Sequence, residues 1–442
     1  MKAKPPSWLL GAAMVVLELL AGMQAYVSST VTPLLAAELG GTRLYGRAMA
    51  AVQAAVFLAL PLSPALIRRW SGARVLVWLT PITVLCAVVA AAAPSMEVYI
   101  GARFVGALGS GAMAGVGMGI IATQLTGRVR QLVLAAGSAM WVVSSLVGPG
   151  YAAWISAVFS WRWALVAYLP VLVAARWVIV RELRGRELGV GEQGALAGGA
   201  EAPVLGALVL AGSVLVLGLR PPIDAVGAVL ALLALVGVGV GLRRVLPRPV
   251  LTRRPHGAPA AVRLLFWLSM AHYGADGVIS IVAHDLMGFD AVRLGGLLMV
   301  GGVAWALLGV ATGARPASAA RAGWQLPSGL LMVFTGLVLL AVACQTGRAW
   351  LWVGWVVVNL GMGAVYLDCL NLAFGPVPVP GMDAADAGMV VVMVESVAGA
   401  VAGTLGASLL SGRPELAWLV FALLAVAVLP GLGEVRRASI TA

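Results

Sequence analysis

Apolar runs long enough to cross a lipid bilayer recur along the whole chain and limit what it can fold into. A membrane-spanning α-helix needs roughly 20 apolar residues to cross about 30 Å of hydrocarbon. Of the 442 residues, 61% are hydrophobic and only 10% are charged, a composition that an ordinary soluble fold cannot bury. Because hydrocarbon offers no water to backbone polar groups, these runs predict membrane-spanning helices and leave no soluble domain.

The apolar runs, separated by Gly, Pro and Arg residues, predict about fourteen spans. The spans cover residues 8–36, 45–67, 75–94, 99–124, 132–156, 163–180, 204–219, 223–242, 260–284, 293–313, 327–345, 349–372, 388–411 and 416–433. We expect an all-α integral membrane protein with six-helix bundles in residues 1–180 and 260–442, and a pair of extra helices within 181–259. Both bundles then run in the same direction, as in transporters whose parallel repeats rock about a site near the bilayer midplane.

In a soluble protein the net charge of +12 would suggest nucleic acid as a partner. Whether it does so here depends on where the charges lie along the chain. With the N-terminus inside, about 19 Lys and Arg residues fall on predicted cytoplasmic segments and about 7 on the opposite side. Lys occurs only at Lys2 and Lys4, and Ala, Gly and Val are abundant, as in GC-rich bacterial genomes. We expect a monomer in a bacterial inner membrane, with both termini cytoplasmic, the bilayer as its partner and no nucleic acid bound.

Two glycine-containing stretches in the first half resemble motifs of the major facilitator superfamily. Residues 103–111 begin with Arg103 and are similar to the family's Arg-x-x-Gln-Gly-x-Gly-x-Gly, with Gly106 in place of Gln. In the family this Arg is linked to proton coupling. Residues 144–153 hold Gly148-Pro149, which resembles the core of the antiporter motif. The alternative is structural, because an Arg can reach the interface, glycines allow close packing and Pro kinks a helix.

The stretch Ser160-Trp161-Arg162-Trp163, followed by Tyr168, is the most specific family signal. It resembles the start of the sixth span in fourteen-helix drug:proton antiporters, with Tyr168 in place of Asn. An interfacial Trp/Arg anchor is the structural alternative. The resemblance implies the major facilitator fold and transport driven by the proton gradient, without a bound cofactor or metal.

One cytoplasmic loop departs from the family pattern. Gly72 and Arg74 match the motif that follows the second span, but Arg69 replaces an Asp. In the family that Asp makes a contact that holds one access state. We expect Arg69 either to pair with an acid of a neighbouring cytoplasmic segment, such as Glu182 or Glu187, or to leave the cytoplasmic gate loosely held.

Ionisable side chains inside the predicted spans are candidates for proton coupling, because each costs at least about 2.5–3.5 kcal/mol in hydrocarbon. Glu18 lies near the middle of the first span, and His272 precedes Asp276 by one helical turn on the same face. Glu395 lies inside the thirteenth span, and Asp368 near a helix end. The alternatives are a protonated or helix-bonded Glu18, a local His272–Asp276 hydrogen bond, and Glu395 as counter-charge for a cationic substrate. We expect coupling to depend on Asp276 and Glu395 more than on Glu18.

Aromatic and amide side chains within the spans are candidates to line a substrate cavity, although packing or interfacial roles are the alternative. These residues are Trp141, Trp305, Trp355, Asn359 and Tyr366. No catalytic dyad, phosphate-binding loop or metal-ligand cluster accompanies them, so we do not expect an enzyme.

The leading hypothesis is a proton-coupled exporter of amphipathic drugs or lipids that works by alternating access. The alternative is a non-catalytic membrane partner or sensor on a transporter fold. Arg69 motivates the alternative, as does Gln24, which lies in the first span where many relatives have Asp.

Overall fold

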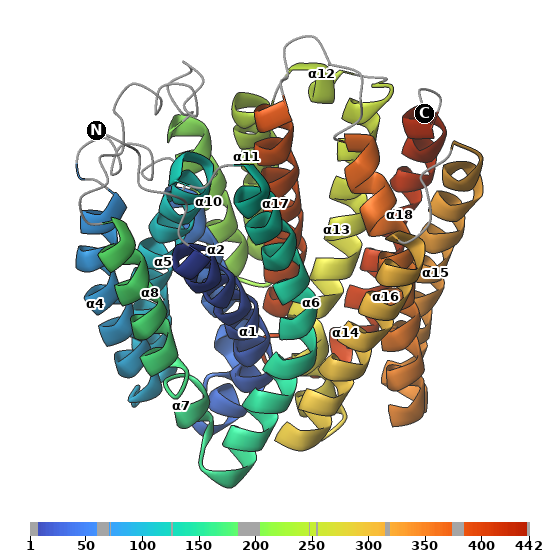
Figure 1. Ribbon diagram of the computed structural model, residues 1–442. Helices are drawn as coiled ribbons and strands as arrows, with labels where there is room; N and C mark the ends of the chain where they lie inside the picture. The colour runs from blue at the N-terminus through green and yellow to red at the C-terminus, as the bar shows by residue number, and fades with distance from the viewer. Residues whose placement is uncertain are drawn as a thin grey trace. The chain divides into compact units, whose positions relative to one another are not determined.

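A computed structural model describes residues 8–59, 70, 72–124, 127–183, 204–246, 248–252, 255–313, 319–373 and 384–439. These residues form helices joined by short turns, and no strand occurs among them. Figure 1 shows the order of the helices along the chain. In the first half they are α1 (Trp8–Glu38), η1 (Thr42–Leu44), α2 (Tyr45–Ala59), α4 (Gly72–Ala91), α5 (Met96–Gln124), α6 (Gly127–Val158), α7 (Trp161–Ala164) and α8 (Leu169–Leu183).

The second half continues with the same alternation of long helices and short turns. Its elements are α10 (Val204–Leu219), α11 (Ala225–Val245), α12 (Arg248–Leu251), α13 (Ala258–Ile281), η2 (Val282–Leu286), α14 (Ala291–Gly313), α15 (Ala319–Thr346), α16 (Arg348–Ala373), α17 (Ala384–Leu410), η3 (Pro414–Leu416) and α18 (Ala417–Ser439). The turn before α11 illustrates how a helix begins: the Asp224 carboxylate accepts from the Gly227 N–H at 2.7 Å. The Arg220 guanidinium and this N–H hold the pKa of Asp224 below its usual range.

The predicted all-α membrane architecture is confirmed. Eleven helices of the described part are long and apolar enough to cross a membrane. With α2, α5 and the shorter apolar α10, they account for each of the predicted spans. Large apolar side chains are exposed on peripheral helices, Trp78 at 71% on α4 and Val310 at 68% on α14. Such exposure is expected where lipid, rather than water, surrounds the protein.

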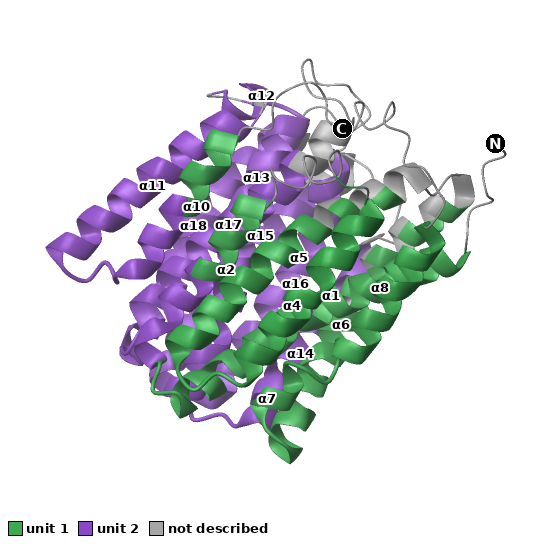
Figure 2. Ribbon diagram, turned by 90° about the vertical axis from the view of Figure 1, so that its left-hand side faces the viewer, with its two compact units in different colours: residues 1–41, 51–211 green, residues 42–50, 212–442 purple. Residues whose placement is uncertain are grey.

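The chain divides into two compact units, coloured separately in Figure 2. Unit 1 comprises residues 1–41 and 51–211, and unit 2 comprises residues 42–50 and 212–442. The segment 42–50 belongs to unit 2 because the Tyr45 hydroxyl lies 3.3 Å from Asp285 Oδ1 and the Gly46 N–H donates to Ser411 Oγ at 3.3 Å. The grouping of the sequence into 1–180, 181–259 and 260–442 stays a prediction.

Unit 1 is built on close contact between α1 and α6. A Cβ added at Gly22 would lie 2.5 Å from Ser144 Oγ, and one at Gly148 would lie 2.9 Å from Tyr26 Cβ. The Ser144 hydroxyl donates to the Leu19 carbonyl at 2.8 Å across the same interface. Small residues therefore let the two helices approach closely.

Unit 2 contains a second close helix pair, α15 with α16. A Cβ at Gly336 would lie 2.6 Å from the Val358 backbone N, and one at Gly361 would lie 2.7 Å from the Gly329 carbonyl oxygen. Beside them α13 is buried along nearly its whole length, including the polar Ser269 and His272. The centre of unit 2 is therefore a set of tightly packed helices around α13.

Gly336→Ala should destabilise the protein by about 1–3 kcal/mol, because the new methyl group meets backbone atoms that cannot move aside without shifting a helix. The apparent thermal unfolding midpoint of purified protein in detergent measures the effect. Gly239→Ala on α11 is the matched control, since a Cβ there meets nothing within 4 Å and Ala favours the helix. Equal midpoints for the two variants would contradict the close packing of α15 and α16.

Candidate functional site

A cluster of polar and aromatic side chains lies inside unit 2, where four helices contribute to it. His272 and Tyr273 come from α13, Trp305 from α14, and Glu395 from α17. Helix α16 supplies the residues that link them, namely Trp355, Asn359 and Tyr366. We call these seven residues the polar cluster of unit 2.

His272 is almost fully buried, with 2% of its surface exposed. Its Nε2 lies 3.2 Å from Asn359 Oδ1, while Asn359 Nδ2 donates to the Trp355 carbonyl at 2.9 Å. Because Asn359 presents its oxygen to the imidazole, Nε2 carries the hydrogen. His272 Nδ1 is buried and has no hydrogen-bond partner within the described ranges. The ring therefore keeps one nitrogen available inside a buried site.

Aromatic rings surround His272 on several sides. The centroid of its ring lies 5.1 Å from that of Trp305, 5.3 Å from Tyr273 and 6.2 Å from Trp355, the last in a stacked arrangement. Gly301 of α14 makes room for this packing, because a Cβ there would lie 2.2 Å from Trp355 Nε1 and 2.9 Å from Asn359 Nδ2. The rings give the cluster broad apolar faces beside a few polar atoms.

Tyr366 connects the aromatic rings around His272 to the carboxyl group of Glu395. Its ring meets Trp305 edge to face at 5.7 Å between centroids, and its hydroxyl is hydrogen-bonded to Glu395 and to Tyr273. Glu395 Oε1 is buried and has no partner among the described residues. The carboxyl group therefore has one oxygen held by Tyr366 and capacity left for a proton or a ligand.

Asp276 lies one helical turn after His272, and its side chain is half-buried. No hydrogen bond or ion pair to Asp276 occurs in the part of the chain that the structure describes. Neighbouring glycines bring α13 and α17 together at this level, since a Cβ at Gly277 would lie 3.3 Å from the Gly403 Cα. The local His272–Asp276 hydrogen bond, the structural alternative for this pair, does not form among the described residues, where His272 pairs with Asn359.

Three of the residues predicted to couple protons or line a cavity belong to unit 1 and lie outside this cluster. Glu18 on α1 is half-buried beside Gly137 of α6, where a Cβ would lie 3.3 Å from Glu18 Cγ. Arg103 on α5 donates from Nη2 to Ser28 Oγ at 2.8 Å. Trp141 on α6 is 48% exposed.

The residues predicted to support conformational change are distributed over unit 1. Gly148 and Pro149 are buried in α6, with Gly148 against α1. Gly72 is buried at the start of α4, and Arg74 is exposed. Arg69 lies outside the described residues, so its proposed pairing stays a prediction.

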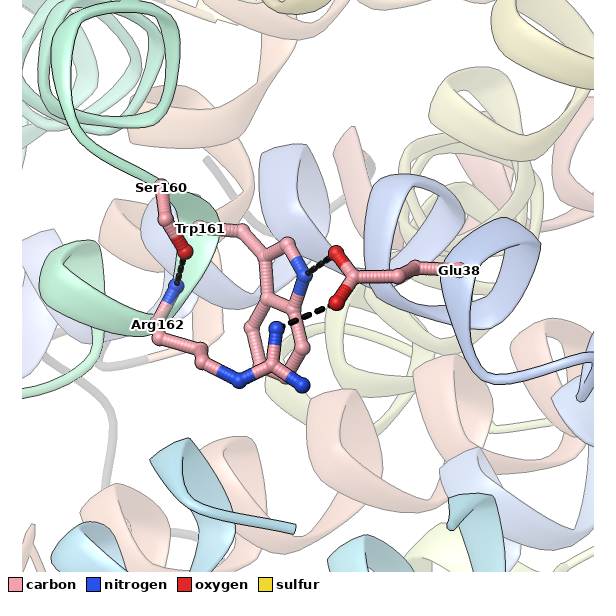
Figure 3. A network of polar contacts seen from close by, with 4 residues as sticks. All are labelled: Glu38, Ser160, Trp161 and Arg162. Atoms are coloured by element: carbon pink, nitrogen blue, oxygen red, sulfur yellow. Dashed lines mark hydrogen bonds and ion pairs between the residues drawn. The ribbon is translucent and has the colours of Figure 1, made fainter. Parts of the chain in front are cut away.

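The Trp-Arg stretch after α6 has a defined role in unit 1, shown in Figure 3. The Trp161 indole N–H donates to Glu38 Oε2 at 2.6 Å, and Arg162 forms an ion pair with the other carboxylate oxygen. The Arg162 guanidinium lies 4.3 Å above the Trp161 ring, and Ser160 Oγ accepts from the Arg162 N–H. The stretch therefore ties the end of α1 to α7 as well as suiting an interface.

Sequence reasoning missed three positions. Tyr273 belongs to the polar cluster of unit 2 and Gly301 packs against it, and nothing in the sequence distinguishes them from other aromatic and glycine residues in the spans. Arg176 is 9% exposed in the middle of α8. The cost of burying a charge in hydrocarbon is the signal in the sequence that singles out Arg176. Within the described ranges no three His, Cys, Asp or Glu side chains gather as metal ligands would.

The family model described as Major Facilitator Superfamily matches residues 14–407. Two Mycobacterium tuberculosis proteins, each named "Probable multidrug-efflux transporter", are 29% identical over 152 residues, 34% of this chain and 32% of theirs. The chain thus spans about a third of the length of these curated relatives. The crystal structure of the human organic anion transporter MFSD10 (TETRAN) has the same fold, with a TM-score of 0.58, 15% identity and coverage of 98% of this chain and 100% of that one.

Asn359→Leu should lower the stability of the protein by about 1–3 kcal/mol, because it removes the partner of a buried imidazole and leaves both ring nitrogens unpaired. The thermal unfolding midpoint in detergent measures this change. Adding His272→Leu to Asn359→Leu should recover much of the loss, since both polar groups are then gone. Asn371→Leu, at an exposed position of the same helix, is the control. An unchanged midpoint for Asn359→Leu would contradict the bond.

Proposed function

Because the chain belongs to the major facilitator superfamily, whose members are carriers and not enzymes, we propose that it is a secondary transporter that exports amphipathic drugs or lipids in exchange for protons. The single observation that carries the proton coupling is the polar cluster of unit 2. There a carboxyl group and an imidazole are buried, each with one atom that lacks a partner among the described residues.

Burial makes the charge of these groups depend on their surroundings. A carboxylate without a counter-charge is costly in hydrocarbon, so Glu395 and Asp276 are stable there as neutral acids or when water reaches them. Opening to the side with the higher proton concentration would therefore favour proton uptake from water, and opening to the other side would favour proton release, while the neutral acid is the stable form in between. This cycle is what alternating access needs to couple transport to a proton gradient.

The aromatic side chains of the same cluster support an amphipathic substrate. Trp305, Trp355 and Tyr366 present large faces, while Asn359 and Glu395 offer a small number of polar contacts. Sites for small molecules commonly combine a mostly apolar lining with a few placed polar groups. The name of the mycobacterial relatives, multidrug-efflux transporter, agrees with this substrate class over the third of the chain that they match.

We further propose that the protein lies in a bacterial inner membrane with both termini in the cytoplasm. The excess of Arg on alternate connections supports this orientation, as do the apolar helices α10 and α11, which return the chain to the side it left.

Cysteine labelling tests this topology in a variant that lacks Cys86, Cys344 and Cys369. A membrane-impermeant maleimide added outside the cell should react with Pro222→Cys and not with His256→Cys, because α11 separates the two positions. Lysed cells, in which both should react, provide the control. Equal reactivity of both cysteines in intact cells would contradict the fourteen-span arrangement.

The coupling prediction concerns the acids of the spans. Glu395→Gln and Asp276→Asn should each reduce pH-driven transport in proteoliposomes at least about tenfold, since an amide cannot carry the exchanged proton. Glu18→Gln, the matched control in unit 1, should retain most of the activity. Substrate-dependent proton flux with ethidium or a fluorescent phospholipid, followed with a trapped pH dye, gives the measurement.

The opposite pattern, with loss of flux only in Glu18→Gln, would place the coupling in unit 1. If no amphipathic probe caused proton movement in the wild type, the sensor or partner role would be favoured instead.

A further inference from the structure

Two guanidinium groups lie within the spans of unit 1, and the hydrogen bonds that they make to described residues go to hydroxyl groups. Arg176 of α8 is 9% exposed and donates from Nη1 to Thr83 Oγ1 of α4 at 2.9 Å. Arg103 of α5 donates from Nη2 to Ser28 Oγ of α1 at 2.8 Å. Among the described residues neither guanidinium forms an ion pair with a carboxylate.

The depth of Arg176 excludes a simple reach to the membrane surface. Arg176 stands midway between Leu169 and Leu183, so it is about 10 Å along the helix axis from either end of α8. Glu18, an acid of the α1 span, lies about 15 Å along α1 from Ser28 and does not compensate Arg103. A buried guanidinium without a counter-ion, such as that of Arg176, is costly. Each of the two guanidinium groups has five N–H donors, of which one bonds to a described residue.

Tyr168 adds a hydroxyl to the same region. It precedes α8, is half-buried, and interacts electrostatically with both Arg103 and Arg176. Thr83 of α4 also packs closely against α5, because a Cβ at Gly109 of α5 would lie 2.7 Å from Thr83 Cγ2. Arg103 of α5 and Arg176 of α8 are therefore each within electrostatic range of the Tyr168 phenol.

We propose that Arg103, Arg176 and Tyr168 form a subsite for the oxyanion head group of an amphipathic substrate, a phosphate or a carboxylate. Guanidinium groups bind oxyanions through paired N–H donors, and a phenol donates one further hydrogen bond. A bound oxyanion supplies the negative charge that the described part of unit 1 does not place beside these arginines. This assignment rests on the proposed transport function and narrows its substrate class to anionic amphiphiles.

Matched eight-carbon amphiphiles test the proposal by their effect on the thermal unfolding midpoint of the purified full chain in a neutral detergent. Octyl phosphate and octanoate should raise the wild-type midpoint, whereas octyl glucoside and octyltrimethylammonium should not. Inorganic phosphate alone should protect far less, because the apolar tail is missing. Arg176→Met should weaken octyl phosphate binding at least about tenfold.

Two further variants separate binding from a purely structural role. Arg176→Lys should retain part of the preference for octyl phosphate, since it keeps the charge but loses the planar donor pair. Tyr168→Phe should weaken binding modestly while leaving the midpoint without ligand near that of the wild type. Both keep the test open if Arg176→Met fails to fold.

Equal protection by anionic, neutral and cationic head groups would overturn the subsite. So would unchanged octyl phosphate binding in every folded variant at Arg176 and Tyr168. Proton flux that depends on Glu395 in a protein without anion preference would refute this subsite alone. Octyl phosphate binding without any proton flux would support the subsite and refute the proposed coupling.

Discussion

Hydrocarbon leaves no water for polar groups, and the rest of the structure depends on this constraint. Backbone groups are satisfied within helices, so the described chain is helical throughout the spans. Helices attract one another in lipid by close contact rather than by hydrophobic burial, which is why Gly148 meets α1 and Gly336 meets α16 with no room for a side chain. The same constraint makes each buried polar side chain expensive and therefore informative.

The two units hold ionisable side chains within their spans by different chemistry. In unit 2, Glu395 is held by the Tyr366 hydroxyl and His272 by Asn359, among aromatic rings. In unit 1, Arg103 and Arg176 are held by hydroxyl groups of neighbouring helices. Groups of the first kind can exchange a proton, whereas a guanidinium stays charged and can only attract an anion. Under the proposed function, proton coupling and substrate recognition would thus rest on different residues.

The cost of burying a polar group in hydrocarbon predicts individual site residues from the sequence. It does not predict which of these residues contact one another. Asp276 and His272 follow each other on one helix, yet His272 is paired with Asn359, which lies on α16 and is distant in sequence. Trp141, chosen by the same reasoning as Trp305, is half exposed and belongs to unit 1. Helical spacing in a sequence predicts which residues share one face of a helix, but it does not predict which other helix packs against that face.

By itself the sequence determined the class of fold and the number of spans, because hydrophobic length and backbone satisfaction depend on local composition. Its Trp161-Arg162 and Gly148-Pro149 stretches also pointed to the family. Only the tertiary structure decided which polar groups form hydrogen bonds with one another. Trp161 donates to Glu38, Tyr366 is bonded to Glu395, and Arg176 donates to Thr83. These contacts join helices far apart in the chain, and the rotation of each helix about its axis is set by packing rather than by its own residues.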